Sequence, residues 1–481
     1  MTVVSHIFKR AVGRAVIALL VCLAVLGCVA QKKLSESQEK REAQTPNIVF
    51  IFADDLGFGD IGANGNTRFN TPNLDRLAKQ GTNFQQFTVA SPVCSPSRAA
   101  VLTGQFPDRH LIFQHFNTVE HHQRNGMPDW LDPKAPSIAR VLQDTGYVTG
   151  HFGKWHLTNR PIPDAPEPEA YGFDHYAVFN GPGPQTDAVA VFSDALDFID
   201  AHKDQAFFLN LWIHETHTPH YPDPAQVKAY AHMDEQAQIY AATVSSADDG
   251  VGQVMDRLDA LGLRENTIII FSSDNGPEVT ADESERYLTT DPDAAVEGRD
   301  PLGRYFSVGT TAGLRGKKRD LYEGGIRVPF LVSWPGVVPQ GAVDAQSVLN
   351  AVDLFPTFAG IAQAELPSGY QPDGQNVLPA LRGAAFERQK PLFWQRLGPA
   401  SEDGAPRQVW AAMRDGKWKY IRQVDGSVLL FNVEQDPYEE INLANDYPDI
   451  AEAMSAEFAV WQSTLPSDLP KAAISKERNS R

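Results

Sequence analysis

Two continuous apolar stretches, far apart in the sequence, each run directly into a group of polar side chains. They occupy residues 47–55 (NIVFIFADD) and 267–275 (TIIIFSSDN). Apolar, β-branched and aromatic runs of this kind predict strands buried on both faces, which is typical of parallel sheets covered by helices. Because such sheets place ligands at the carboxyl ends of their strands, the sequence predicts an α/β fold with a polar site at one sheet edge.

The polar ends of these two strands have the composition of a hard-cation site. They supply the carboxylates of Asp54, Asp55 and Asp274 and the amide oxygen of Asn275. Oxygen ligands without a partnering His or Cys select Ca²⁺ or Mg²⁺ over zinc. A lone pair of adjacent aspartates is usually a solvated turn, so the prediction depends on both strand ends meeting at one site.

Further segments extend the fold prediction. After about residue 365 the sequence changes to Pro- and Gly-rich segments around short alternating strands, with an Asp415-Gly416 hairpin turn. This change predicts a smaller C-terminal part from 366 to 481. Strands are predicted at 147–150, 207–213, 330–334, 409–414, 418–422 and 429–432, and helices at 73–80, 137–144, 234–261, 350–360 and 450–465.

Cys94 stands at the start of another predicted helix. Pro96 fits its first turn, residues 99–102 are helix formers, and Gly104 suits its end. Backbone N–H groups and the dipole at a helix N-terminus favour an anion, and Arg98 returns toward Cys94 one turn later. One interpretation is a nucleophile in an anion-attracting pocket. The other is a small residue packed beneath a loop.

Two more segments carry basic residues in suggestive places. Lys154 and His156 are two residues apart, so on an extended segment they face the same side and meet a single anion. Residues 313–329 begin with a basic cluster that includes Lys318. Surface positions around a buried Trp155, and a solvated basic turn, are the respective alternatives.

The N-terminus resembles an export signal. Basic residues within 9–14 precede an apolar run over 15–26, which is too short for a comfortable membrane span. The run ends in Val25-Leu26-Gly27-Cys28, which resembles a bacterial lipobox. We expect a signal peptide at 1–27, a lipidated Cys28 and a flexible linker over 28–45. The protein would then be a lipoprotein of the periplasm, outer membrane or cell surface, touching the membrane only through its anchor. Plain secretion is the alternative, since Leu26 is atypical.

Charge and cysteine usage limit the classes of function. The net charge of −18 argues against nucleic-acid binding, which needs a basic surface. Of the three cysteines, Cys22 leaves with the signal and Cys28 is acylated. Cys94 then remains alone, without a disulfide partner, which fits a thiol kept for chemistry.

Taken together, these motifs resemble the formylglycine-dependent (type I) sulfatases of the alkaline phosphatase-like superfamily, and bacterial polysaccharide sulfatases in particular. The resemblance rests on C-x-P-x-R followed by A-A-x-L-T-G at 94–104, on G-K-W-H at 153–156, and on L-R-G-K-K through Y-E-G-G-x-R-x-P at 314–329. It implies a large mixed, mostly parallel sheet sandwiched by helices in a catalytic domain at 46–365. A smaller C-terminal antiparallel sheet with one helix follows at 366–481.

The resemblance also implies roles for individual residues. A formylglycine-generating or maturase enzyme would oxidise Cys94 to formylglycine (3-oxoalanine), whose hydrate is the nucleophile. The metal, Ca²⁺ or alternatively Mg²⁺, would be bound by Asp54, Asp55, Asp274, Asn275 and the modified Cys94. The remaining catalytic roles would be stabilisation of the hydrate by Arg98, sulfate contact by Lys154 and Lys318, base catalysis by His156, and protonation of the leaving alcohol by His217 or Lys318.

The substrate prediction depends on the segment 110–124, which is rich in His and polar residues. A hydrated surface loop is the alternative. We expect a carbohydrate-binding lip for a sulfated poly- or oligosaccharide of algal type, in the carrageenan or ulvan class. The predicted substrate residues are His115, His121, His122, Arg124, His214, Trp394 and Arg396. A phosphodiesterase or phosphonate monoester hydrolase of the same superfamily is one alternative, and an inactive glycan-binding surface lipoprotein is another.

Overall fold

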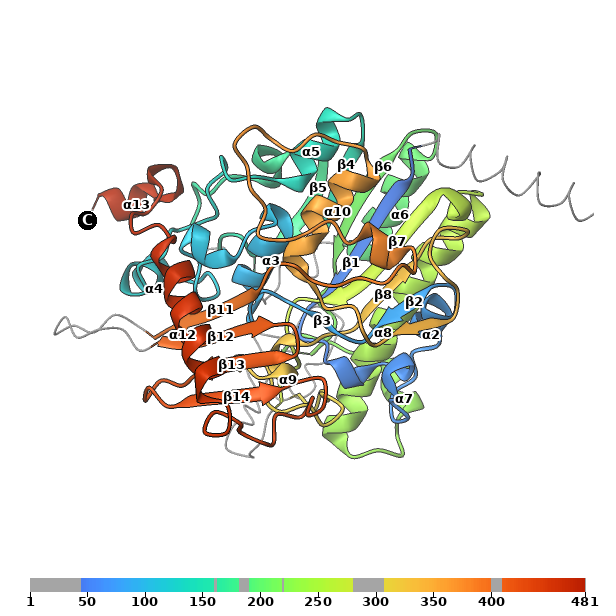
Figure 1. Cartoon of the computed structure of the whole chain (residues 1–481). Coiled ribbons are helices and arrows are strands. Elements are labelled where there is room, and N and C mark those ends of the chain that lie inside the picture. Colours follow the sequence, from blue (N-terminus) through green and yellow to red (C-terminus); the bar gives the residue numbers. More distant parts are fainter. Residues whose placement is uncertain are drawn as a thin grey trace, which may run out of the picture. The chain divides into compact units, whose positions relative to one another are not determined.

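An eight-stranded sheet in the order β5-β4-β6-β1-β7-β8-β2-β9 forms the centre of the computed structural model (Figure 1). Neighbouring strands run parallel except at β8, which is antiparallel to both β7 and β2. The mixed, mostly parallel sheet predicted above is therefore confirmed. The strands are β1 (Asn47–Ala53), β2 (Thr82–Phe84), β4 (Val148–Lys154), β5 (His175–Phe179), β6 (Phe207–Trp212), β7 (Thr267–Ser273), β8 (Phe330–Ser333) and β9 (Ala342–Asp344).

Both faces of this sheet are covered, as the apolar runs predict. In β1, Ile48, Phe50 and Phe52 pack into one hydrophobic core, whereas Val49 and Ile51 pack into a second core on the other face. The first core also takes residues from α3 (Cys94–Thr103), α5 (Ile138–Asp144) and α10 (Leu354–Ile361). The second takes residues from α2 (Pro72–Lys79), α6 (Val191–His202) and α8 (Glu235–Ala260).

A second, four-stranded sheet follows in the chain, with the order β11-β12-β13-β14. All its neighbouring strands are antiparallel, and α12 (Pro448–Ser463) packs on β13 and β14 (Figure 1). Asp415 pairs with Trp418 around the predicted hairpin turn. The strands are β11 (Leu392–Leu397), β12 (Val409–Asp415), β13 (Trp418–Arg422) and β14 (Val428–Asn432).

Short elements complete the architecture. A two-stranded parallel sheet joins β3 (Phe87–Thr88) to β10 (Leu349–Asn350). Among the described residues, the remaining α-helices are α4 (Val119–Arg124), α7 (Pro224–Ala229), α9 (Glu323–Ile326), α11 (Leu378–Leu381) and α13 (Lys476–Asn479). Within the described residues, no helix combines the length and apolar character that a membrane span requires.

The structure describes residues 45–159, 162–180, 190–218, 220–279, 307–398 and 409–480. The predicted signal peptide, Cys28 and all but the last residue of the predicted linker lie outside these ranges. Residues Pro46–Arg481 form one compact unit. The division near residue 365 thus remains a prediction from composition.

Candidate active site

The carboxyl ends of β1 and β7 bring the predicted metal ligands together. Ala53 pairs with Ser273 in the parallel register, so Asp54 and Asp274 are the next residues on adjacent strands. The Asp55 backbone N–H donates to Asp274 Oδ1 at 3.2 Å, and Asn275 Nδ2 donates to Asp55 Oδ1 at 2.7 Å. The two distant strand ends therefore converge, as the sequence predicts.

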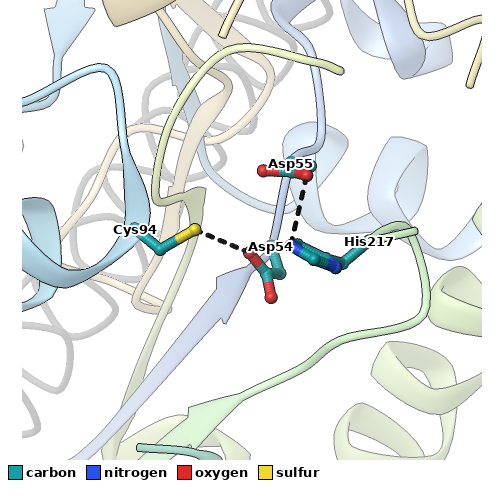
Figure 2. A group of neighbouring side chains, drawn as sticks. All are labelled: Asp54, Asp55, Cys94 and His217. Carbon is teal, nitrogen blue, oxygen red and sulfur yellow. Dashed lines mark hydrogen bonds and ion pairs between the residues drawn. The ribbon is translucent and has the colours of Figure 1, made fainter. Parts of the chain in front are cut away.

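Cys94 and His217, from two other segments, lie beside the aspartate pair formed by Asp54 and Asp55 (Figure 2). Cys94 is the first residue of α3, and its Sγ lies 3.6 Å from Asp54 Oδ1. His217, in the loop after β6, places Nε2 at 3.7 Å from Asp55 Oδ2. Potential ligand atoms of Asp54, Asp55, Cys94 and His217 all lie within 4.8 Å of one another.

The residues at this point fit a divalent cation. Burial, and next Asp54, raise the pKa of Asp274 to about 7 even though Arg98 and Lys154 lie close. Burial also raises the pKa of Asp55 against the opposing charge of Lys318. The buried Asn275 Oδ1 has no hydrogen-bond partner among the described residues. A hard cation would supply the missing positive charge and satisfy this oxygen.

Three buried cationic side chains surround the same carboxylates. Lys154 Nζ lies 2.6 Å from Asp54 Oδ2, and Lys318 Nζ lies 2.6 Å from Asp55 Oδ2. Burial opposes ionisation of Asp54, but the charges of Lys154 and Arg98 hold its pKa well below the ordinary value. The lysine segments predicted to contact sulfate thus meet at the strand ends.

Arg98 binds the carboxylate cluster directly. Its Nε and Nη2 donate to Asp274 Oδ2 at 3.0 and 2.7 Å, and its Nη1 donates to the Lys154 carbonyl at 3.2 Å. The guanidinium therefore ties α3 to the ends of β4 and β7.

His156 lies beyond the strand end and not on the extended segment that its spacing from Lys154 predicts. Strand β4 ends at Lys154, and His156 has a left-handed backbone with φ of 50°. Its Nε2 lies 3.1 Å from the Phe116 carbonyl, which can only accept, so Nε2 carries the proton. Burial, then Lys154, holds the pKa of His156 well below its ordinary value. The imidazole is therefore neutral and keeps Nδ1 as an acceptor.

The predicted catalytic side chains other than the fully buried Arg98 open onto one cavity of about 550 Å³. Its size and its mixture of charged and amide groups are those of a small-ligand site. The predicted residues that line it are Cys94, His115, Lys154, His156, His217 and Lys318. The lining residues that sequence analysis did not single out are Val93, Phe116, Asn117, Asn159, Asn180, Thr218, Glu278 and Arg319, although Phe116 and Asn117 lie within the predicted carbohydrate-binding segment.

The missed residues carry little sequence signal. Asn180 directly follows β5, so the rule that points to Asp54 and Asp274, a polar residue just after a strand, would have found it. Glu278 and Arg319 adjoin the recognised segments around Asn275 and Lys318, but no spacing rule singles them out. Asn117 lies in a loop without periodicity.

The predicted carbohydrate-binding segment 110–124 contributes His115, Phe116 and Asn117 to the cavity, whereas its later residues lie elsewhere. His122 is fully buried, its Nδ1 lies 3.0 Å from Asp129 Oδ1, and its Nε2 accepts the Asn117 N–H at 2.7 Å. His121 lies near His115, with the two rings tilted and their centroids 5.5 Å apart, but does not line the cavity, and neither does the exposed Arg124. His122 is therefore a buried structural residue and not the predicted substrate contact, whereas substrate binding by His121 and Arg124 stays a prediction.

Three further predicted substrate residues have protein partners in the structure. Trp394 is 1% exposed, and its indole N–H donates to the Val89 carbonyl at 2.7 Å, so it is a core residue. His214 Nδ1 lies 2.6 Å from Asp54 Oδ2, which makes it a partner of the carboxylate cluster. Arg396 does not line the cavity, and its Nη1 donates to the Arg319 carbonyl instead.

Comparison with known proteins agrees with this geometry. A family model described as Sulfatase matches residues 46–364, and one described as N-sulphoglucosamine sulphohydrolase, C-terminal, matches residues 316–463. The chain belongs to the sulfatase family. This sulfatase is 31% identical over 469 residues to arylsulfatase G of Homo sapiens, with 84% of each chain covered.

Two bacterial-type relatives cover more of the sulfatase. An ulvan-active sulfatase of Formosa agariphila is 26% identical over 505 residues, covering 97% of this chain and 88% of that protein. The crystal structure of Ps i-CgsB in complex with k-i-k-neocarrahexaose aligns with a TM-score of 0.72 and 28% identity, covering 91% of this chain and 96% of that one. Both the family and the alkaline phosphatase-like fold predicted from the motifs are thus confirmed.

Proposed function

We propose that this sulfatase hydrolyses sulfate esters on an algal-type polysaccharide or its oligosaccharides, in the carrageenan or ulvan class. One observation carries the proposal: Cys94, Lys154 and Lys318 line the same cavity as several neutral amide side chains. The cationic groups suit a sulfate, and the amides suit sugar hydroxyls. The ulvan-active relative and the carrageenan-oligosaccharide complex support the choice of sugar.

The proposed reaction uses a divalent cation, and the strand ends provide ligands for it. Asp54, Asp55, Asp274 and Asn275 would hold Ca²⁺, or alternatively Mg²⁺, beside Cys94. A cation bound there would offset the negative charge of the sulfate oxygens, which otherwise repel a nucleophile. Lys154 and Lys318 add fixed positive charge to the same end of the cavity.

The unmodified thiol is a poor nucleophile in these surroundings. Burial raises the pKa of Cys94 to about 12, so almost no thiolate exists at neutral pH. This supports oxidation of Cys94 to formylglycine by a maturase, after which the aldehyde hydrate supplies the hydroxyl nucleophile. Arg98 would hold the loop that carries it.

The proposed cycle has two steps. One hydrate hydroxyl attacks sulfur and loses its proton to solvent, the bond between sulfur and the ester oxygen breaks, and the leaving alkoxide takes a proton from a side chain to become the alcohol. His156 Nδ1 then removes the proton from the second hydroxyl, the bond between carbon and the sulfate oxygen breaks, and the aldehyde returns as sulfate leaves. Water rehydrates the aldehyde for the next turnover.

We assign the leaving-group proton to Lys318. Burial holds the pKa of His217 well below its ordinary value, so this histidine is neutral. Burial opposes the charge of Lys318, but the carboxylate of Asp55 outweighs it and raises the lysine pKa. Lys318 is therefore the protonated member of the pair at neutral pH.

Sulfate release from a panel of defined sulfated carrageenan and ulvan oligosaccharides tests the proposal. We expect turnover on at least one of them, and much slower release of alcohol from a phosphate monoester, a phosphodiester and a phosphonate monoester. Faster hydrolysis of a phosphorus ester would instead assign the chain to phosphodiesterase-type chemistry. Binding of the oligosaccharides without any turnover by formylglycine-bearing, metal-loaded protein would favour a glycan-binding role.

A further inference from the structure

One charged pair on the cavity wall takes no part in the steps above. Arg319 Nη1 donates to both carboxylate oxygens of Glu278, at 2.8 and 2.7 Å, and both residues line the cavity. The Arg319 side chain is 52% exposed, while that of Glu278 is 16% exposed. Lys318 Nζ lies 3.7 Å from Glu278 Oε2, so the pair stands beside the lysine assigned to the reacting sulfate.

The backbone of Arg319 is held in an unusual conformation. Its φ is 80°, in the left-handed region that residues other than glycine seldom occupy. Its N–H donates to the Pro92 carbonyl at 2.9 Å, and its own carbonyl accepts from the Arg396 guanidinium. Such a conformation persists where neighbouring contacts fix it, which is common at functional sites. Arg319 is thus anchored to the segment that leads into Cys94.

One edge of the Arg319 guanidinium is left for a ligand. Glu278 engages only Nη1, and in the part of the chain that the structure describes neither Nε nor Nη2 of Arg319 has a hydrogen-bond partner. The Nε and Nη2 groups of an arginine form two parallel donors that match two oxygens of a sulfate or carboxylate. An oxyanion can therefore bind Arg319 while Glu278 stays on Nη1.

Lys154 and Lys318, the other cationic side chains of the cavity, are directed at the metal-site carboxylates. Lys154 and Lys318 each lie 2.6 Å from a carboxylate of the aspartate pair, at the end of the cavity where the reacting ester must sit. Arg319 is the residue next to Lys318 in the chain, so its free edge addresses a different substituent of the same bound sugar or its neighbour.

We propose that Arg319 binds a second oxyanion of the substrate, a sulfate or a carboxylate near the hydrolysed ester, and so selects polyanionic sugars. Arg396 acts as a positioning residue, because it holds the Arg319 carbonyl. The inference rests on the proposed sulfatase activity toward carbohydrates and specifies which members of that class are preferred.

The test compares three matched disaccharides with the same hydrolysable sulfate. One has no other charge, one carries a second sulfate, and one carries a uronic acid carboxylate. For the full-length enzyme we expect kcat/KM to favour at least one charged substrate over the neutral one by about 10- to 100-fold. In Arg319→Gln this ratio should fall to near unity, mainly through KM. Arg319→Lys should retain part of it, since it keeps the charge but loses the paired donors.

Arg382→Gln serves as the matched control, because Arg382 is exposed and does not line the cavity. This variant should keep the wild-type ratio. The charged substrate that loses its advantage in Arg319→Gln identifies the oxyanion as sulfate or carboxylate.

Two results would overturn the inference alone: a wild-type enzyme that hydrolyses all three disaccharides equally, or an Arg319→Gln variant with an unchanged ratio. Absence of turnover on all three would overturn the proposed function as well. Dissociation constants of the three disaccharides, measured with Cys94→Ala protein with and without Arg319→Gln, give the same preference as a ratio of affinities. That measurement guards against a variant that merely loses catalytic geometry.

Discussion

Cys94 is the residue on which the proposed chemistry depends, and it can be changed with little disturbance. Cys94→Ala removes one sulfur atom from a buried position at the start of α3 and leaves the helix-forming residues in place. We expect turnover to fall by at least about 10³-fold, while the unfolding temperature changes little. Sulfate release and thermal unfolding measure the two effects.

Ser97→Ala is the matched control for Cys94→Ala. Ser97 lies on the same helix and is equally buried, and its hydroxyl has no hydrogen-bond partner among the described residues. This variant should retain turnover. Peptide mass spectrometry of the active enzyme should show formylglycine at position 94, and a fully active sample with an unmodified cysteine would contradict the proposed nucleophile.

His156 is assigned to the second step only, which gives its substitution a distinctive signature. His156→Ala should release about one equivalent of alcohol per active site in a rapid burst and then stall, because the sulfated intermediate cannot lose its proton. We expect steady-state turnover to fall by about 10²- to 10⁴-fold. Quenched-flow measurement of alcohol and sulfate separates the steps, and equal loss of both without a burst would place His156 elsewhere.

The pH dependence of turnover follows from the same residue. Because burial and Lys154 hold the pKa of His156 well below its ordinary value, its neutral, basic form persists as the pH falls. Protonation of His156 should therefore cause no loss of kcat between about pH 7 and the ordinary histidine pKa near 6.5. A kcat profile for the metal-saturated enzyme, recorded in wild type and His156→Ala, checks this. A limb near 6.5 that vanishes in the variant would contradict it.

At the scale of elements, a buried ionic network joins the segment carrying Lys318 to the C-terminal sheet. Lys419 on β13 lies 2.9 Å from Glu323 Oε1 and 2.8 Å from Glu439 Oε1, and all three side chains are fully buried. The Glu323 backbone N–H at the start of α9 donates to Glu439 Oε2 at 2.6 Å. The four-stranded sheet thus fixes one wall of the cavity although none of its strands lines it.

Removal of the central cation should be costly. Lys419→Met leaves two carboxylates buried without it, and we expect a loss of about 3–5 kcal/mol in the free energy of unfolding. Denaturant unfolding measures this. The matched control is Lys417→Met, two residues away on an exposed turn, for which we expect a change within about 0.5 kcal/mol. Similar losses in both variants would show that the network contributes little.

Helices and strands were predictable where the hydrophobic pattern extends over enough residues to be recognised. Strands β1, β6 and β7 are continuous apolar runs, and α8 spans 26 residues with helical spacing, so the main sheet and its cover follow from the sequence. Strands β2, β3, β9 and β10 have two or three residues each and carry no period. Their place is set by tertiary pairing.

Single positions were predictable only where a strand end or a motif marked them. The polar segment around His122 resembles a hydrated loop, but it folds inward because Asp129 pairs with His122. Asp129 in turn accepts the Ser475 N–H at 2.8 Å from a segment 346 residues away. No local signal encodes such a contact. The left-handed turn at His156 is likewise a tertiary outcome, since the motif alone predicts an extended chain.

For the molecule as a whole, the carboxylate cluster predicts that stability depends on a cation. Removal of divalent ions with EDTA should lower the unfolding temperature, and Ca²⁺ or Mg²⁺ should restore it. At about a hundredfold excess over the dissociation constant, the cation would stabilise the fold by about 2.7 kcal/mol. Differential scanning calorimetry across a titration of each ion also ranks the two.

Asp274→Asn should abolish this response, because it removes one of the buried carboxylates at the strand ends. Asp256→Asn, on the exposed surface beside Arg76, should preserve it. An unfolding temperature indifferent to EDTA and to both ions would contradict the predicted metal site.

The burial of Cys94 also limits when its proposed oxidation can occur. The side chain is 3% exposed, and it packs against a site whose last strand, β7, begins 173 residues further along the chain. A modifying enzyme has to reach the thiol while the nascent polypeptide is still open, before β7 docks beside β1. If overproduction makes the chain faster than the enzyme modifies it, the product would be well-folded but inactive molecules. No later treatment of the native protein would restore their activity.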